Sequence, residues 1–401
     1  MTYSAVLRNR EFAALVLSQA LSILGDQLAR IAVAVLVFDR TGSALAASGT
    51  YAMSYLTYLL GGPVLSAISD RRPRLRVMVV CDLVRAPLIL ALCVRDIPLW
   101  VLFLVLGAVG AFGPPFDSAR SAVQPDILTG EAYVMGNALM QVVTQSAQVL
   151  GFGLGGALVA ATSARTALAI DSSTFMLSAG VLLLGLRLRP AAQAIAERQS
   201  LFRDTLSGIQ LVGSDAHLRS LLYYAILGTA SVIATEGLAV PVAHELGHGA
   251  LAAGVLTATV PLGYLAASVC LLRVEPDRRP TLMPALIFFG CLPLLMTPLS
   301  SSVLVVGLLW FIAGAGGAVN LIASSAFMQA CPREYRSRAY GVANTCLYAS
   351  QGAALLAAGA LATPFGSRGS VAALALATMV GLWVTSRMSA FETQGFLKAR
   401  R

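Results

Sequence analysis

Long apolar segments dominate this chain and constrain its fold more than any other feature. Hydrophobic residues make up 57% of the 401 residues and charged residues only 12%, which leaves too little polar material to cover a soluble protein of this size. The apolar segments run to about 20 residues, the length with which a helix crosses a hydrocarbon core about 30 Å thick. The sequence therefore predicts an all-α membrane protein with twelve spans, beginning near residues 13, 46, 77, 98, 133, 167, 219, 250, 281, 302, 339 and 368.

An internal repeat divides these spans into two sets of six. The tetrapeptide Asp-Arg-Arg-Pro occurs at 70–73 and again at 277–280, and the same offset of 207 residues superposes Gly107 on Gly314 and Asn137 on Asn344. Such a register indicates duplication. It predicts two pseudo-symmetric six-helix bundles that rock around a central site, as in transporters. We assign residues 1–188 to the first bundle, 218–401 to the second and 189–217 to a linker with an amphipathic surface helix at Leu201 to Val212.

The basic residues give the expected orientation. Of the 28, twenty-one fall in loops on one side and four (Arg40, Arg95, Arg165 and Arg368) on the other. By the positive-inside bias, both termini are cytoplasmic and the chain lies in the inner or plasma membrane. This distribution also explains the net charge of +9, so we expect lipid rather than nucleic acid as the partner of the basic surface.

The fourth span carries glycines followed by Pro114 and Pro115, a combination that should break a helix. The tenth span keeps Gly314 and Gly317 but has Leu321 and Ile322 in place of the prolines. We therefore expect a break in only one half, where a substrate or a gate would reside, although small residues at this spacing also serve close helix packing.

Four segments resemble a known family. They are Ser22-Ile-Leu-Gly-Asp26 with Arg30, the loop from Gly61 to Arg76, Asp82-Leu-Val-Arg-Ala86, and Gly151-Phe-Gly-Leu-Gly-Gly156. Together, over essentially the whole chain, they resemble the major facilitator superfamily, and specifically its exporter branch with enterobactin and macrolide efflux proteins. The resemblance implies a monomeric secondary transporter without enzymatic activity or cofactor, which exports a drug-like or siderophore-like small molecule in exchange for protons.

The sequence departs from the family pattern at three places. Ser66 and Pro73 stand where the loop signature usually has glycine, and Phe152 to Leu154 lacks the proline of the antiporter motif. These departures weaken the expectation of proton antiport more than the family assignment.

Charged residues inside spans are the candidates for proton coupling, since an isolated charge there costs at least ~2.5 to 3.5 kcal/mol. Asp26 and Arg30 are four residues apart on one helical face, and form either a proton-sensitive pair or a structural salt bridge. Glu236 has no basic neighbour within a turn; it is a proton carrier, or else it is solvated near the outer end. We expect Asp171 near the outer leaflet in a structural role.

A polar stripe marks the fifth span, with a counterpart in the eleventh. Its members share one helical face, which lines the central cavity or else serves hydrogen bonding between helices. The candidate cavity residues are Asn137, Gln141, Thr144, Gln145, Gln148, Asn344, Tyr348 and Gln351.

The two repeated loops provide a candidate cytoplasmic gate. Asp70 and Asp277 can each cap a helix of the opposite half, near Pro332 and Pro125 respectively, with basic neighbours Arg71, Arg74 and Arg278. The same-face pairs Asp82 with Arg85 and Asp117 with Arg120 are assigned structural or gate roles.

Two other function classes compete with transport. A scaffold or sensor could retain the fold, but it would not need polar stripes in two spans. His244-Glu-Leu-Gly-His248 matches the zinc-hydrolase pattern, but Gly247 weakens the required helix and the segment falls in a short outer loop. The six cysteines are scattered without a C-x-x-C pair, so we expect no bound metal.

Overall fold

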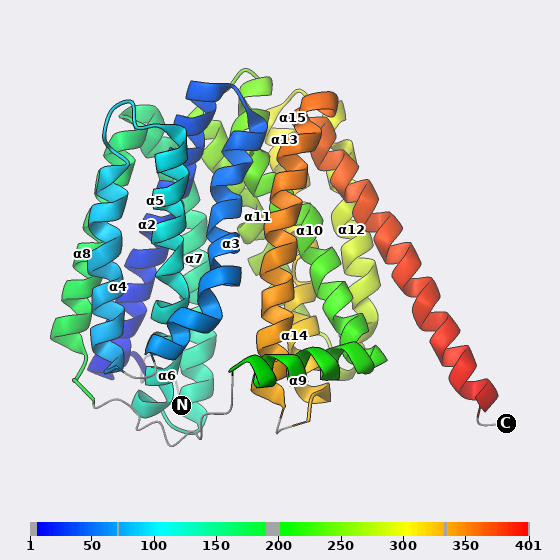
Figure 1. Ribbon diagram of the computed structural model, residues 1–401. Coiled ribbons are helices and arrows are strands. Elements are labelled where there is room, and N and C mark those ends of the chain that lie inside the picture. The colour runs from blue at the N-terminus through cyan, green and yellow to red at the C-terminus, as the bar shows by residue number, and fades with distance from the viewer. Residues whose placement is uncertain (1–5, 70–71, 190–200, 333–334, 400–401) are drawn as a thin grey trace.

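The computed structural model describes residues 6–69, 72–189, 201–332 and 335–399, and every regular element within these ranges is a helix. Figure 1 shows the long helices side by side, with both chain termini at one edge of the bundle. We call that edge the basic end, since the helix ends and loops there hold most of the arginines, and the opposite edge the far end.

The amino half consists of seven helices that make six crossings, because α5 and α6 together form one. Their bounds are α2 Arg10–Thr41, α3 Ala44–Ser69, α4 Arg74–Ala91, α5 Leu99–Ala111, α6 Gly113–Ile127, α7 Glu131–Ala161 and α8 Ala164–Gly185.

The carboxyl half also makes six crossings, and it is preceded by a helix that lies across the basic end (Figure 1). The bounds are α9 Leu201–Ser214, α10 Ala216–Glu245, α11 Ala250–Leu271, η1 Pro276–Arg278, η2 Pro280–Leu282, α12 Met283–Met296, η3 Thr297–Leu299, α13 Val303–Gly316, α14 Val319–Ala330 and α15 Arg336–Ala399.

Membrane-spanning length and composition account for these helices. Nine helical segments of the described chain are long and apolar enough to cross a bilayer. α3 and α4 complete the set, and Gly366, at φ 71° and ψ 165°, kinks α15 into two crossings. The fold prediction of twelve helices in two bundles is confirmed, and each observed span begins within a few residues of its expected start.

The expected asymmetry between the fourth and tenth spans is wrong. The fourth is broken at Phe112, between α5 and α6, as its prolines predict. The tenth is also broken, between α13 and α14, where the amide of Ala318 bonds to the carbonyl of Ala315 in a tighter turn. Glycines are sufficient for this break, because they tolerate a change of helical pitch without proline.

At the far end the two halves pack closely. A Cβ atom added to Gly156 of α7 would lie 2.7 Å from the Cα of Gly254 of α11, so the two backbones are in contact. Phe38 of α2 and His244 of α10 also meet there edge to face, with ring centroids 5.3 Å apart. The far end is therefore sealed by direct contact of one half with the other.

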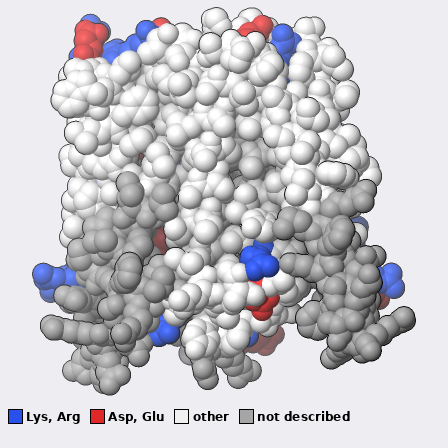
Figure 2. Space-filling model, turned by 45° about the vertical axis from the view of Figure 1, so that its right-hand side comes forward, with Lys and Arg blue, Asp and Glu red and all other residues white. Residues whose placement is uncertain are grey.

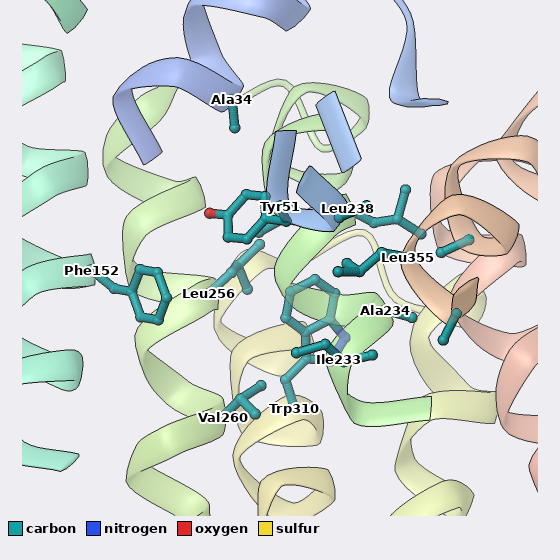
Figure 3. Close-up of a cluster of buried hydrophobic side chains, with 14 of the residues drawn as sticks. Ala34, Tyr51, Phe152, Ile233, Ala234, Leu238, Leu256, Val260, Trp310 and Leu355 are labelled. Atoms are coloured by element: carbon teal, nitrogen blue, oxygen red, sulfur yellow. The ribbon is translucent and has the colours of Figure 1, made fainter. Parts of the chain in front are cut away.

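The buried apolar residues form two clusters, one with residues from both halves and one with core residues from the amino half alone. The larger combines both halves, with Tyr51 and Phe152 from one and Leu238, Trp310 and Leu355 from the other (Figure 3). The smaller contains Phe12, Leu75 and Met140 among others, and its core residues all come from the amino half, around its basic end. The halves thus share a core toward the far end, whereas the amino half has a core of its own at the basic end.

The described surface agrees with a membrane environment. Figure 2 shows charged side chains gathered near the two ends of the bundle and a broad uncharged band between them. Large apolar side chains such as Leu177 of α8 and Leu308 of α13 are exposed, as expected of a surface that faces lipid.

Candidate functional site

Arg30 and Glu236, one from each half, interact electrostatically although no ion pair within 4.0 Å joins them in the described structure. The Arg30 guanidinium interacts electrostatically with Glu236 and lies 5.9 Å from the centre of the Tyr55 ring. Glu236 is only 7% exposed, and its Oε2 atom has no hydrogen-bond partner in the described structure. The structure therefore excludes a solvated Glu236, and its role as a proton carrier stays a prediction.

Asp26 has a different cationic neighbour from the one expected. Its largest attractive interaction is with Arg85 of α4, and Arg30 comes second. No ion pair within 4.0 Å links Asp26 to Arg30 in the described ranges. The Arg85 guanidinium lies between two rings, 5.5 Å from the centre of Phe175 and 5.7 Å from that of Phe116. Asp26 is thus attracted mainly to Arg85 of its own half, whereas Arg30 also interacts with Glu236 of the other half.

Asp171 lies in the interior of the amino half, in the first half of α8. It is completely buried and lies against Gly25, near the middle of α2. On α4, Asp82 is also completely buried, and its Oδ2 atom accepts a hydrogen bond of 2.6 Å from Ser178 Oγ. With Asp26 and Arg85, these residues form what we call the amino-half charge cluster.

A small cavity adjoins this cluster. It has a volume of about 80 Å³, and its lining includes Asp26, Arg30, Tyr58 and Arg85. The Tyr58 hydroxyl donates a 2.7 Å hydrogen bond to Asp117 Oδ2, and Asp117 also pairs with Arg120 at 3.2 Å. This space can hold several water molecules, because its walls offer several polar partners.

A second, larger cavity holds two members of the predicted polar stripes. It has a volume of about 400 Å³, and Gln141 of α7 and Asn344 of α15 face it from opposite halves. Its lining carries no charged residue. The complete lining is Gln141, Leu221, Leu222, Ala225, Tyr264, Asn320, Leu321, Ala323, Ser324, Phe327, Tyr340, Ala343, Asn344 and Leu347.

The remaining stripe residues lie outside that lining. Asn137 is exposed, Thr144, Gln145 and Gln148 are half-buried, and Gln351 is 7% exposed. Tyr348 packs against the amino half instead, with its ring centroid 4.9 Å from that of Tyr58. The structure thus brings part of each stripe to a shared cavity and places Tyr348 in an aromatic contact between the halves.

Sequence reasoning missed Tyr264 and Asn320 as cavity residues. Asn320 follows the break between α13 and α14, and its Nδ2 donates to Thr229 Oγ1 at 2.8 Å. The glycines before it were the available signal, because a broken helix in a membrane exposes polar groups where it lines a cavity.

The candidate gate is described only in part. Asp70 and Arg71 lie outside the described residues, and of Asp277 only the backbone, in η1, is described. Arg74 donates to the carbonyl of Ala122 at 2.6 Å and pairs with Asp126 at 2.5 Å, both in α6 of its own half. Arg278 pairs with the exposed Glu275 at 2.9 Å. Both described contacts stay within one half.

A further ion pair at the basic end closes the amino half. Arg189, beyond α8, pairs with Glu11 of α2 at 2.7 Å. The hydrogen bonds that the Arg189 guanidinium donates to Glu11 raise its pKa above the ordinary value, so Arg189 keeps its charge at every physiological pH.

The segment that matches the zinc-hydrolase pattern has a structural role. Glu245 accepts hydrogen bonds from the Ser367 amide and from Arg368, where α15 resumes after its kink. His244 packs on Phe38. The described residues contain no group of three or more potential ligands that could hold a metal ion, so this geometry does not support a metalloprotease.

Comparison with known proteins gives consistent matches. The family model described as Major Facilitator Superfamily matches residues 15–274. An uncharacterized MFS-type transporter of Bacillus subtilis, YfiS, is 31% identical over 170 residues, which cover 42% of this chain and 40% of that protein. The multidrug efflux pump Tap of Mycolicibacterium fortuitum is 24% identical over 88% of this chain and 89% of its own length.

Solved structures agree on the fold. The nucleoside transporter NupG, as its D323A mutant, superposes with a TM-score of 0.78 over 94% of this chain and 99% of its own, at 13% identity. At this identity the likeness concerns the fold alone.

Proposed function

Because the chain belongs to the major facilitator superfamily, we propose that it is a proton-coupled secondary transporter that exports a drug-like or siderophore-like molecule by alternating access. Residues 1–188 and 218–401 are the two moving units and 189–217 is the linker. The protein works as a monomer in the inner or plasma membrane, with the basic end and both termini in the cytoplasm.

One observation carries the proposal: the buried carboxyl group of Glu236 in one half interacts electrostatically with the half-buried guanidinium of Arg30 in the other. Glu236 and Arg30 are held where the halves meet, so protonation of Glu236 weakens an attraction between two units that must separate during transport. A buried charge without a partner is costly, and this cost links the protonation state to the conformation.

The uncharged cavity supports an amphipathic substrate. Gln141 and Asn344 offer hydrogen-bond donors and acceptors from both halves, beside apolar walls that include Phe327 and Leu347. Neither amide makes a side-chain hydrogen bond within the described protein, so both are available to a solute. Pockets for drug-sized molecules have this mixture of apolar surface and a few polar groups.

The direction of transport is proposed from the relatives. Tap is named as a multidrug efflux pump and aligns with most of this chain. The geometry supports export in one respect, since a cavity beside the basic end would take its solute from the cytoplasm.

Efflux from proteoliposomes under an imposed pH gradient tests the proposal, with a panel of macrolides and catecholate siderophores. We expect the gradient to accelerate wild-type efflux, and Asp26→Asn and Glu236→Gln each to remove that acceleration. Asp96→Asn, at an exposed carboxylate after α4, is the matched control and should behave as wild type.

Full gradient-dependent efflux in both centre variants would refute the coupling. Absence of counterflow for every compound, in protein that elutes as a single folded species, would instead favour the scaffold or sensor.

A further inference from the structure

Asp171 is a buried carboxyl group that the proposed function does not use. It is 0% exposed. Its Oδ1 atom accepts a hydrogen bond of 3.3 Å from Thr174 Oγ1, while Oδ2 has no partner among the described residues. A carboxylate in such a site loses its hydration without full compensation, which costs several kcal/mol.

Gly25 brings this carboxyl group to Asp26. A Cβ atom at position 25 would lie 2.2 Å from Asp171 Oδ1 and 2.1 Å from Thr174 Oγ1. No side chain fits there, so the Asp171 carboxyl packs directly on the α2 backbone, one residue before Asp26. The negative charge of Asp26 consequently acts against ionisation of Asp171 across the contact of α2 with α8.

In and around this pair, carboxyl groups outnumber guanidinium groups. The titratable and charged groups that face Asp26 or Asp171 come from all the packed elements that carry them: Arg30 on α2, Asp82 and Arg85 on α4, and Asp117 on α6.

Two of these groups are already engaged. Asp82 accepts the hydrogen bond from Ser178 and lies on the helical face of Arg85, three residues away. Arg30 faces Glu236 in the other half. The half-buried Asp26 and the buried Asp82 and Asp171 are thus all attracted to the guanidinium of Arg85. Neighbouring carboxyl groups with so little compensating charge do not all ionise in a desolvated interior.

We propose that Asp171 binds a proton jointly with Asp26, so that the two carboxyl groups form one proton-binding pair. At rest the pair retains at least one proton. Uptake converts a carboxylate of the pair to a carboxyl group with a proton taken from water, and release returns that proton to water without any other bond being made or broken. The role of the pair in coupling rests on the proposed transport function, but its titration does not.

The geometry also provides a route to the pair. The 80 Å³ cavity runs between Asp26, Tyr58 and Arg85, and the Tyr58 hydroxyl is bonded to Asp117, whose side chain is 40% exposed. Water in the cavity completes a path from Asp117 to Asp26. Because none of these residues lines the larger cavity of Gln141 and Asn344, protons and solute occupy different spaces.

Infrared difference spectroscopy between acid and alkaline pH tests the pair in the purified full-length protein in lipid nanodiscs, without substrate or gradient. In wild type the C=O stretch of protonated carboxyl groups should include the signal of the pair. Asp171→Asn should reduce this signal and shift the midpoint of what remains by about one pH unit or more, as for coupled groups. Asp26→Asn should do the same, and the double variant should abolish the pair signal.

Controls separate a proton-binding role from a structural one. Asp96→Asn, at an exposed position after α4, should leave the pair signal unchanged. Thr174→Val keeps the side-chain shape and should shift the midpoint without removing the signal, which keeps the test open if Asp171→Asn fails to fold. An Asp171→Asn spectrum with wild-type amplitude and midpoint overturns the inference, and so does a carboxylate signal that responds to Na⁺ instead of pH.

The result is independent of the efflux test. A chain driven by another energy source would fail the gradient experiment and keep the pair signal. If the wild-type spectrum lacks the pair signal while efflux still depends on the gradient, only this inference is overturned.

Discussion

Tyr58 of the amino half and Tyr348 of the carboxyl half are in ring contact, with centroids 4.9 Å apart and planes inclined by 44°. Tyr55 adds a second contact to Tyr348 at 6.2 Å. The halves therefore touch through aromatic rings in their interior as well as through glycine backbones at the far end. Aromatic pairs contribute about 0.5–1.5 kcal/mol each beyond their buried area, so these contacts help to hold the observed closure.

A larger side chain at Gly156 should disrupt the far-end contact between the two halves. Gly156→Leu would place its Cβ 2.6 Å from the Ala250 carbonyl oxygen, which forces α7 and α11 apart and favours a conformation open at the far end. We expect efflux to fall at least about tenfold, because a shift of 1.4 kcal/mol or more in the conformational equilibrium has that effect. Labelling of a far-end cysteine by a membrane-impermeant reagent should increase in the same variant.

Gly153→Leu on the same helix is the control, since nothing lies within 4 Å of a Cβ atom added there. Equal efflux and labelling in the two variants would contradict the proposed seal.

The larger cavity should lose affinity when its amides are removed. Gln141→Leu and Asn344→Leu each delete hydrogen-bonding groups that face the cavity, and a lost hydrogen bond of about 0.5–1.5 kcal/mol corresponds to a two- to tenfold rise in KM. Counterflow at varied substrate concentration measures this change. Asn137→Leu, on α7 but outside the lining, should leave KM unchanged. A similar rise in KM for Asn137→Leu would mean that substrate binding depends on the whole stripe and not on the cavity residues.

The hydroxyl group of Tyr58 should contribute more to the rate of gradient-driven efflux than its ring does. Tyr58→Phe retains the packing on Tyr348 but removes the hydrogen bond to Asp117. We expect gradient-driven efflux to slow by about tenfold or more at unchanged KM, because a proton-transfer group has been deleted. Stopped-flow recording of a pH indicator inside proteoliposomes provides the measurement. Tyr133→Phe, at a half-buried site in the same half, controls for loss of a hydroxyl, and wild-type rates in both variants would exclude this route.

Glu245 should contribute to stability and not to catalysis. Glu245→Ala removes the acceptor for the Ser367 amide and for Arg368 at the kink of α15. A lost helix cap costs about 0.5–2 kcal/mol, so Tm in detergent should fall by a few degrees at most while efflux persists. His248→Ala, with an exposed side chain in the same segment, should leave Tm unchanged. Zinc-dependent peptide cleavage by the wild type would contradict this assignment.

The sequence predicted what depends on one helix at a time. The twelve spans follow from apolar length, and the break before Pro114 follows from the geometry of proline. The shared face of Gln141 and Thr144 follows from helical periodicity. The break before Val319 was missed, because the prediction relied on proline and underrated a run of glycines.

Contacts between helices were beyond the same reasoning. Periodicity states which residues share a face but not which helix that face meets. Arg85 as the main partner of Asp26, Asp171 against Gly25, and Arg30 beside Glu236 all depend on the packing of helices far apart in the chain. A glycine beside a buried Asp is an ambiguous signal until the helix opposite is known.

The break at Phe112 allows α6 to tilt as a unit relative to α5. This 15-residue helix carries Asp117, bonded to Tyr58 near the bundle centre, and Asp126, paired with Arg74 at the rim. A tilt of α6 about Phe112 would strain both attachments in one movement. The ion pair of Asp126 with Arg74 and the hydrogen bond of Asp117 with Tyr58 would then break in the same movement. The rate of the transport cycle would depend on how rigidly α6 transmits this movement.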